Sequence, residues 1–531
     1  MSLFTWFCLI FPIILLFYFY VKRKYSYFEE RNVPFVKPVP LIGNMFLPVL
    51  KGESIVEAFV KLATEFRNEP FIGSFEFLSP GLIIQDPEII KQVTVKNFDN
   101  FVNHRVFTDS VSDELLNNSL LLMKFQKWRD MRAALSPAFT GLKMRMMFDL
   151  MKKCAENFVT YGREQCAKEK NRRVTINPKE IYSKVTVDII STCAFGLEVD
   201  SLRHSDNEMY INAQRLSNMA NVWLALKFIV LSVAPKLGKW LDLTILPKET
   251  GKFFKHLIGK TISFRKENNF YRPDILQLLI EAKDGKLKFE SDQVADEVGF
   301  ATIDESDVGR REVKLEWTDT EITAQCLIFF LGGFETVSTL MNFASYELAI
   351  DTTIQDKLYR EIKHTNDMLN GGPITYDILM KLPYLDAFIC ELLRKHPGQP
   401  GFDRVCNEET LIESDDGKKF TIPKGMVIFV NMFGMHYNPK YFPNPEKFDP
   451  ERFLGENKKN IKPYTYMPFA LGPRACIGSR FALMQAKLLL YHVVLNFEIG
   501  IGPKMCIPFR YKKGFKIEPE GCVVDLIERQ A

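Results

Sequence analysis

The chain has 531 residues, 47% of them hydrophobic, and a formal net charge of +4 from 69 basic and 65 acidic side chains. This balance excludes the strong basic excess of a nucleic-acid-binding protein, so we expect no nucleic acid as a partner. No Gly/Ser-rich or low-complexity stretch interrupts the chain after about residue 50. The ten cysteines form no CxxC pair, which favours reduced thiols in a cytosolic compartment. We therefore expect one large globular domain.

The first apolar stretch runs from Leu3 to Tyr20 without a charge and is followed, after Val21, by a Lys-Arg-Lys run. At about 1.5 Å per residue, such a helix nearly crosses a hydrocarbon core of about 30 Å. A cleaved signal peptide carries its charges before the apolar run, whereas basic residues after the run place the remainder in the cytoplasm. The sequence thus predicts a membrane-anchor helix over residues 3–21, a basic and Pro-rich hinge over 22–44 and one domain over 45–531.

Helical patterns dominate the rest of the chain, and short β-like runs are interspersed. Val222–Ala234 is a second apolar stretch but is too short to span a membrane, so it forms either a core helix or a surface helix that dips into lipid. Prolines recur between His436 and Pro473, which is typical of a long functional loop. The predicted fold class is mainly α with a small β part. The helices are expected over Trp317–Ile350, 384–395 and Ser479–Phe497, and the strands over Phe71–Glu76, Gly81–Ile84 and Met426–Asn431.

One cysteine has distinctive surroundings: Cys476 lies in the segment FALGPRACIG, residues 469–478, just before the third predicted helix. A cysteine at a helix N-terminus faces free N–H groups and the positive end of the dipole, which stabilise a thiolate. Gly472 permits a bend, Gly478 allows close approach of a flat ligand, and Arg474 is suited to pair with a carboxylate on that ligand. For the cysteine alone, the alternative is a buried, inert thiol in a turn.

The segment 469–478 resembles the haem-binding signature of the cytochrome P450 family, Phe-x-x-Gly-x-Arg-x-Cys-x-Gly, at every specified position. The resemblance implies a single P450-like domain in which Phe469, Gly472, Arg474 and Gly478 contact haem b. It also implies that the Cys476 thiolate holds the iron, where it favours O–O cleavage.

The same resemblance implies a monooxygenase that inserts one atom of O2 into a hydrophobic small molecule. Electrons would come from NADPH indirectly, through NADPH–cytochrome P450 reductase, with cytochrome b5 as a further candidate partner. The protein would be anchored in the endoplasmic reticulum membrane and contact its lipid, with the catalytic domain in the cytoplasm.

Further motifs follow in the order expected for this family. Glu391 and Arg394 share one helix face and, with Arg452, resemble the family's structural triad. A Glu-x-x-Arg pair on its own is common and contributes only about 0.3 kcal/mol on a surface. The resemblance implies that these three residues fix the fold around the cysteine loop and are not catalysts.

Three residues are expected on the propionate side of the haem. Trp128 and Arg132 lie four residues apart, on one helix face, and resemble the family's Trp-x-x-x-Arg helix, in which both contact propionate. Arg404 follows the Glu-x-x-Arg helix at the spacing of another propionate contact. Without the cysteine signature, a tryptophan and an arginine at this spacing would carry no meaning.

Two glycines, Gly332 and Gly333, lie in the middle of the longest predicted helix, where each costs about 1 kcal/mol relative to alanine. One explanation is close helix packing, and the other is a local opening that admits a diatomic ligand. Together with Glu335 and Thr336 they resemble the family's oxygen-activation motif. The resemblance implies that Thr336 is a hydroxyl donor in this groove and that Glu335 helps to relay protons from solvent.

The chain departs from the family pattern at His396-Pro397-Gly398, where an aromatic residue and two prolines are common, and we expect His396 to pack in the core. The runs Phe334–Thr336 and Phe448–Phe453 are most similar to insect microsomal members linked to detoxification of plant compounds and insecticides. The apolar candidate pocket segments predict a hydrophobic substrate, either a xenobiotic or an endogenous lipid-like compound. They are Phe101–Leu122, Ile211–Val233, Cys326–Thr336, Gly398–Phe402 and Pro508–Phe515.

Two other functions remain open at this level. A haem-thiolate isomerase or dehydratase would act without O2, and a haem sensor would bind ligand without turnover. Basic residues on the cysteine side favour an acidic reductase as partner, although a solvated surface explains them equally well. They are Lys124, Lys127, Arg129, Lys458, Lys459, Lys462 and Arg480.

Overall fold

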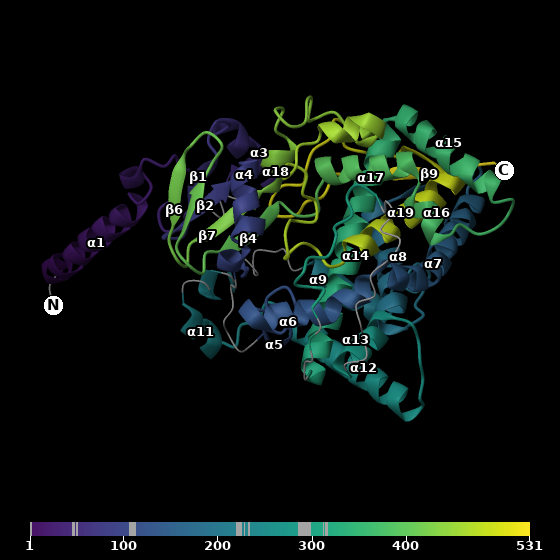
Figure 1. The fold of residues 1–531 in the computed structure, drawn as a ribbon, viewed down its shortest axis with the longest axis horizontal. Helices are drawn as coiled ribbons and strands as arrows, with labels where there is room; N and C mark the ends of the chain where they lie inside the picture. The colour runs from purple at the N-terminus through teal and green to yellow at the C-terminus, as the bar shows by residue number, and fades with distance from the viewer. Residues whose placement is uncertain are drawn as a thin grey trace.

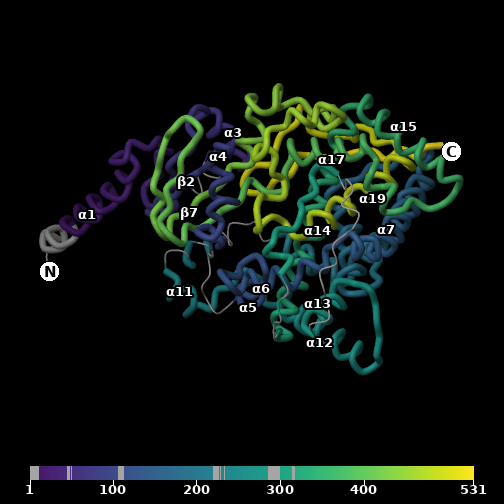
Figure 2. The backbone as a smooth tube through the Cα atoms, viewed as in Figure 1, coloured from purple at the N-terminus to yellow at the C-terminus, as the bar shows by residue number. Residues whose placement is uncertain are grey.

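The structure is a computed structural model that describes residues 3–44, 48, 51–105, 113–218, 226–227, 229–231, 234–284, 299–311, 313 and 317–530, with the side chains of residues 11 onward. Helix α1 (Leu3–Tyr25) projects from one side of the body, next to a small β part (Figure 1). Helices make up most of the remainder, and the C-terminus lies on the side opposite α1 (Figure 2). This architecture confirms the prediction of a mainly α domain with a smaller β part.

The helices of the body agree closely with the sequence patterns where those were strong. The predicted helix over 384–395 is α17 (Pro383–Lys395), and the one over Ser479–Phe497 is α19 (Ser479–Asn496). The other helices are α3 (Ile55–Glu65), α4 (Pro87–Lys91), α5 (Glu114–Asn117), α6 (Phe125–Leu135), α7 (Gly141–Ala167), α8 (Pro178–Ile190), α9 (Glu208–Ser217), α11 (Pro235–Trp240), α12 (Lys248–Glu267), α13 (Ile275–Lys283), α14 (Asp319–Ile350), α15 (Thr352–Met368), α16 (Tyr376–Met380) and α18 (Met432–His436).

The described strands form three sheets. The largest has the order β1-β2-β7-β4, in which β2 and β7 are parallel and the other neighbours are antiparallel. Alternation along β4 turns Phe402 and Arg404 inward, which places a guanidinium inside the molecule. The strands of this sheet are β1 (Phe71–Glu76), β2 (Ser79–Ile84), β7 (Val427–Asn431) and β4 (Gly401–Val405). The second sheet consists of β3 (Arg173–Ile176), β9 (Val524–Glu528) and β8 (Phe497–Ile501). The third consists of β5 (Thr410–Glu413) and β6 (Lys419–Ile422).

Helix α14 is the central helix of the core. A capping box starts it: the Thr318 side chain accepts the N–H of Glu321 at 3.2 Å, and the Glu321 carboxylate accepts the N–H of Thr318 at 3.0 Å. By length and apolar composition, α14 is the one helix within the described ranges that passes as a membrane span, but most of its apolar stretch is buried inside the protein. We therefore assign α14 to the core, where it positions residues 332–336.

The segment after the apolar N-terminal run packs onto the sheet. Helix α1 continues to Tyr25, four residues beyond the predicted end of the anchor, and the Tyr25 hydroxyl donates to the carbonyl of Phe77 at 3.1 Å. Phe28 has no exposed surface and packs edge-on against Phe75, at 5.2 Å between ring centroids. Much of the predicted hinge over 22–44 is thus docked on β1.

Candidate functional site

Cys476 lies in a tight loop that leads into α19. Gly472 has a φ of 72°, and a Cβ added there would lie 1.9 Å from the carbonyl oxygen of Thr94, so only glycine fits against this backbone. The N–H of Cys476 donates to the carbonyl of Phe469 at 2.9 Å, which closes the turn. Gly478 follows as the residue that caps α19. The loop therefore presents Cys476 just before the helix, as its spacing predicts.

The Cys476 side chain has accessible surface. Burial raises the pKa of the Cys476 thiol, and the N–H of Gly478 and the charge of Arg132 lower it by less. The Gly478 N–H and Arg132 thus favour the thiolate, as predicted, but they do not by themselves outweigh the effect of burial. A bound metal cation would, because coordination deprotonates a thiol.

Arg474 ties the cysteine loop to the chain that precedes α6. Its Nε donates to the carbonyl of Val102 at 2.9 Å, Nη1 to that of Leu120 at 3.1 Å and Nη2 to that of Met123 at 2.6 Å. The guanidinium also lies 4.1 Å from the centroid of the Trp128 ring. The sequence suggested that Arg474 pairs with a ligand carboxylate, and in the structure each of its three nitrogens already donates to a backbone carbonyl.

Arg132 reaches the cysteine loop from α6. Its Nη1 donates to the carbonyl of Ala475, the neighbour of Cys476, at 2.8 Å. Its Nε and Nη2 donate to the Glu305 carboxylate, at 3.1 and 2.7 Å from Oε2. Glu305 belongs to the segment 299–311 between α13 and α14, and sequence reasoning missed it because no motif marks that segment.

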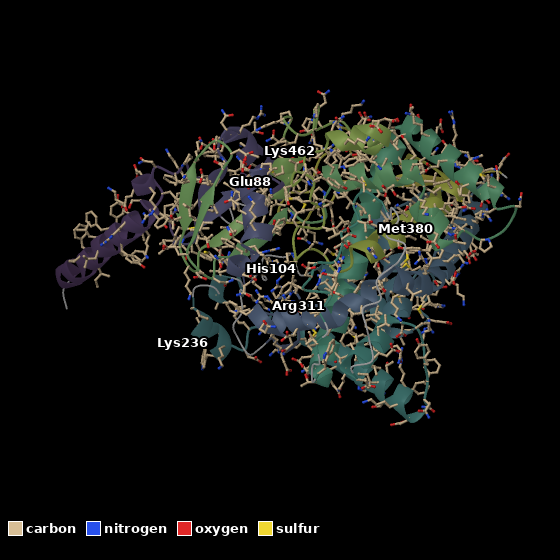
Figure 3. The ribbon with its side chains drawn as sticks, viewed as in Figure 1. Glu88, His104, Lys236, Arg311, Met380 and Lys462 are labelled. Atoms are coloured by element: carbon tan, nitrogen blue, oxygen red, sulfur yellow. The ribbon has the colours of Figure 1, made fainter. Side chains whose placement is uncertain are left out.

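Arg404 is the least satisfied of the buried arginines. Its Nη1 donates to the carbonyl of Asp403 at 2.6 Å and lies 3.4 Å from Nδ1 of His104, whereas its Nε and Nη2 have no hydrogen-bond partner. His104 hydrogen-bonds the Asp403 carboxylate at 3.1 Å and is labelled beside the sheet in Figure 3. Burial, followed by the charge of Arg404, lowers the pKa of His104 to about 4, so this histidine is neutral. His104 and Asp403 were not predicted.

The residues around the cysteine loop fit haem, an iron-bound macrocycle with two propionates. Burial lowers the pKa of Arg474, and the positive charges of Arg404 and Arg132 lower it further. Burial also lowers the pKa of Arg404 to about 10. Because buried polar donors are normally hydrogen-bonded, the free N–H groups of Arg404 indicate an anionic ligand. A sulfur ligand for iron and unpaired donors for a carboxylate are what this cofactor requires.

The two mid-helix glycines of α14 serve different purposes. A Cβ added to Gly333 would lie 2.7 Å from Ile190 of α8, so this glycine permits close helix packing. Nothing lies within 4 Å of a Cβ added to Gly332, which is an open position in an otherwise buried helix. The Thr336 hydroxyl donates to the carbonyl of Gly332 at 2.7 Å. The packing explanation therefore holds for Gly333, whereas an opening that admits a diatomic ligand at Gly332 stays a prediction.

Glu335 is held by an ion pair and a hydroxyl. Its Oε1 lies 3.0 Å from Nζ of Lys179 on α8, and its Oε2 accepts the hydroxyl of Ser217 on α9. The same ammonium donates to the hydroxyls of Ser338 at 2.9 Å and Thr339 at 2.8 Å. The residue predicted to relay protons thus joins three helices, and its partners Lys179 and Ser217 carried no sequence signal.

The predicted structural triad comes together. Arg394 and Glu391 form a fully buried pair, and Nε of Arg452 lies 3.4 Å from Oε1 of Glu391. Nη1 of Arg394 donates to the carbonyl of His436, at the start of the long Pro-rich loop, at 3.0 Å. These contacts connect α17 to the loop that leads toward Cys476.

Most of the predicted basic surface has acidic neighbours. Lys127 lies 2.8 Å from Glu321, and Arg129 lies 2.6 Å from Asp99. Of the candidate pocket segments, residues 106–112, 219–225, 228 and 232–233 lie outside the described residues, as does most of Val222–Ala234. A groove of about 900 Å³ lies along α12, but none of the predicted site residues lines it.

A mainly helical body, a cysteine loop before α19 and a buried arginine with free donors fit a protein that holds haem through a cysteine sulfur. The family model for cytochrome P450 matches residues 33–524, so the chain belongs to the cytochrome P450 family and is a haem monooxygenase.

Several curated relatives extend over nearly the full length. The chain is 36% identical to cytochrome P450 9e2 of Blattella germanica, over 98% of this chain and 97% of the relative. It is 36% identical to probable cytochrome P450 9f2 of Drosophila melanogaster, over 95% of each protein. It is 34% identical to cytochrome P450 6k1 of Blattella germanica, over 91% of this chain and 88% of the relative.

Proposed function

We propose that this monooxygenase binds haem b with the Cys476 thiolate as the axial ligand of the iron. Arg404 is the principal propionate anchor, because its buried Nε and Nη2 have no partner of their own. Trp128, Arg132 and Arg474 complete that side; Arg474 adds positive charge, and the charge of Arg132 is balanced by Glu305. The free donors of Arg404, close to a cysteine loop with an accessible thiol, carry this proposal. When bound, the haem supplies O2 binding and O–O cleavage.

The residues of α14 supply the proton and the space for oxygen. Gly332 leaves the groove open, and Gly333 lets α14 pack closely against α8. Thr336 presents a hydroxyl donor to the groove, held at present by the Gly332 carbonyl. Glu335 and Lys179 are 28% and 18% exposed, so a proton from solvent can enter at this ion pair and move toward the groove. In this proposal Glu335 and Thr336 act in sequence as carrier and donor.

Helix α1 is proposed to anchor the protein in the endoplasmic reticulum membrane. Its large apolar side chains between Phe11 and Tyr20 are 42–70% exposed, which suits lipid and not water. The basic residues that end the helix place the catalytic domain on the cytoplasmic side. Electrons then come from NADPH through NADPH–cytochrome P450 reductase, with cytochrome b5 as a second donor.

The substrate class is a hydrophobic small molecule, either a xenobiotic, insecticides included, or an endogenous lipid-like compound. The half-buried apolar side chains of Phe329 and Leu331 beside Gly332 support an apolar substrate. An isomerase or dehydratase would not need the Thr336 hydroxyl, and a sensor would not need a solvent-connected acid such as Glu335. The arrangement of α14 therefore favours oxygen insertion over both alternatives.

The deciding experiment is the carbon monoxide difference spectrum of the reduced protein. We expect the red-shifted Soret band of thiolate-ligated haem in the wild type and its loss in Cys476→Ser. Cys506→Ser is the matched control, because Cys506 is a half-buried thiol outside the site. A His-ligated spectrum in the wild type, or an unchanged band in Cys476→Ser, would show that the assigned ligand is wrong.

A further inference from the structure

The segment 299–311, here called the strap, crosses the face of the protein that carries the cysteine loop. The N–H of Phe300 donates to the Asp386 carboxylate on α17 at 3.0 Å. The Phe300 ring packs against Tyr466, at 5.6 Å between centroids. Asp304 lies 3.7 Å from Arg480 at the start of α19. The strap therefore contacts two helices and the Pro-rich loop before it returns toward α14; Figure 3 labels its last residue, Arg311.

Glu305 is the one strap carboxylate that points into the protein. Arg132 meets it through two nitrogens, Ser136 directly after α6 places its hydroxyl 2.8 Å from Oε2, and the N–H of Ser306 donates to Oε1 at 3.0 Å. A Cβ added to Gly309 would lie 2.3 Å from the Glu305 carboxyl carbon, so the strap leaves room for this side chain. Both oxygens of the Glu305 carboxylate therefore accept hydrogen bonds.

We propose that Glu305 is a positioning residue for the haem-thiolate loop. By taking Nε and Nη2 of Arg132, it orients the remaining nitrogen so that Nη1 donates to the carbonyl of Ala475, next to Cys476. It also neutralises a buried guanidinium that otherwise faces the charge of Arg474. The inference rests on the proposed role of Cys476, and it adds a residue from outside the family motifs to the support of the thiolate.

The ion pair between Arg132 and Glu305 is strong enough to affect the position of the cysteine loop. An arginine–carboxylate contact through two nitrogens is stronger than a neutral hydrogen bond, and this one is largely shielded, with Arg132 6% and Glu305 16% exposed. Without Glu305 the guanidinium is free to leave the Ala475 carbonyl, and the backbone beside Cys476 loses a fixed donor. We therefore expect the thiolate ligation, more than the global fold, to weaken.

The test compares Glu305→Ala and Glu305→Gln with Asp304→Ala in the full-length haem protein. The Asp304 side chain is 90% exposed and its ion pair is long, so it is the matched control. On mild warming we follow the loss of the thiolate-type carbon monoxide band together with the far-ultraviolet circular dichroism. Loss of the band is expected to be about tenfold faster in Glu305→Ala, intermediate in Glu305→Gln and close to wild type in Asp304→Ala. The helical signal should stay constant over that period.

Two results would overturn the inference. One is a Glu305→Ala band as persistent as that of the wild type, and the other is a loss of the band that only follows unfolding. If Glu305→Ala does not fold, the same comparison is decided by Glu305→Gln, which keeps the shape of the side chain. Failure of the proposed function gives a different result, because the wild type itself would then lack the thiolate band.

Discussion

The guanidinium of Arg394 meets the carboxylate of Glu391 through two parallel hydrogen bonds, Nε to Oε2 at 2.7 Å and Nη2 to Oε1 at 2.8 Å, and neither side chain is exposed. Glu391 also accepts the N–H of Asp449 at 2.8 Å. On a surface, such a pair contributes only a few tenths of a kcal/mol, whereas in the interior neither partner can be removed without leaving an unpaired charge.

Glu391→Ala is therefore expected to lower the free energy of unfolding by about 3–5 kcal/mol, because Arg394 stays buried without its counter-ion. Denaturant unfolding of the purified protein measures this loss. Glu451→Ala serves as the control, since Glu451 pairs with Lys357 on the surface at 2.7 Å and should change the free energy by less than about 1 kcal/mol. Equal losses in both variants would contradict the assigned role.

Arg404→Leu is expected to separate haem binding from stability. The variant loses donors for a propionate, so haem should transfer to excess apomyoglobin about tenfold faster or more. The apoprotein should be as stable as the wild type or more stable, because an unpaired buried cation is gone. Arg145→Leu is the control, since Arg145 lies on the surface, 2.7 Å from Asp377. A drop in apoprotein stability with unchanged haem retention would show that Arg404 is only structural.

Thr336→Ala should uncouple electron consumption from product formation. The variant lacks the hydroxyl donor of the groove, so we expect more hydrogen peroxide and less product for each NADPH oxidised. Thr323→Ala is the matched control, because Thr323 lies on the same helix and its hydroxyl also bonds the carbonyl four residues earlier, at 2.8 Å. Full product yield for each NADPH in Thr336→Ala would refute the role of this hydroxyl.

Acid should destabilise the protein through His436. Its Nδ1 donates to the carbonyl of Arg394 at 3.0 Å, and its Nε2 accepts the N–H of Met467 at 3.0 Å. The second of these hydrogen bonds requires the neutral ring, because a protonated Nε2 cannot accept. Burial, followed by the charge of Arg394, lowers the pKa of His436 from 6.5 to about 3. The unfolded chain therefore takes up a proton first. The stabilising contribution is complete above pH 6.5 and is lost as the pH falls toward about 3.

The measurement is the free energy of unfolding between pH 7 and pH 5. One such histidine adds a slope of at most about 1.4 kcal/mol per pH unit, and His436→Gln should reduce the slope by up to that amount. His256→Gln, at an exposed position of α12, should leave the slope unchanged. A variant His436→Gln with the slope of the wild type would show that this ring does not titrate on unfolding.

Elements with local signals could be predicted from the sequence. Strand β1 has the predicted bounds, Phe71–Glu76, and α17 begins within one residue of its predicted start, where Pro383 occupies the first turn. Helix α14 starts at its capping box, two residues after the predicted start. Caps, proline positions and periodicity are properties of neighbouring residues, which explains this agreement.

Contacts between distant segments could not be predicted. Glu305 meets Arg132 across 173 positions of the chain, and neither composition nor periodicity indicates that pair. The same holds for Lys179 beside Glu335, and for the backbone carbonyls that take up the donors of Arg474. The family motif indicated which arginines to expect near the haem, but only the packing distinguishes Arg404, with free donors, from Arg132 and Arg474, whose nitrogens already have partners.

The junction between α1 and the sheet has a consequence for the orientation of the whole molecule. Because the Tyr25 hydroxyl bonds the β1–β2 turn and Phe28 is fully enclosed, the body cannot swivel about α1 without breaking this packing. The tilt of the helical body against the axis of α1 is therefore set by side chains. In any bilayer that α1 enters, the edge of the largest sheet would lie at one fixed depth relative to the membrane surface. Any path by which lipophilic molecules enter the protein near this edge would open at that same depth.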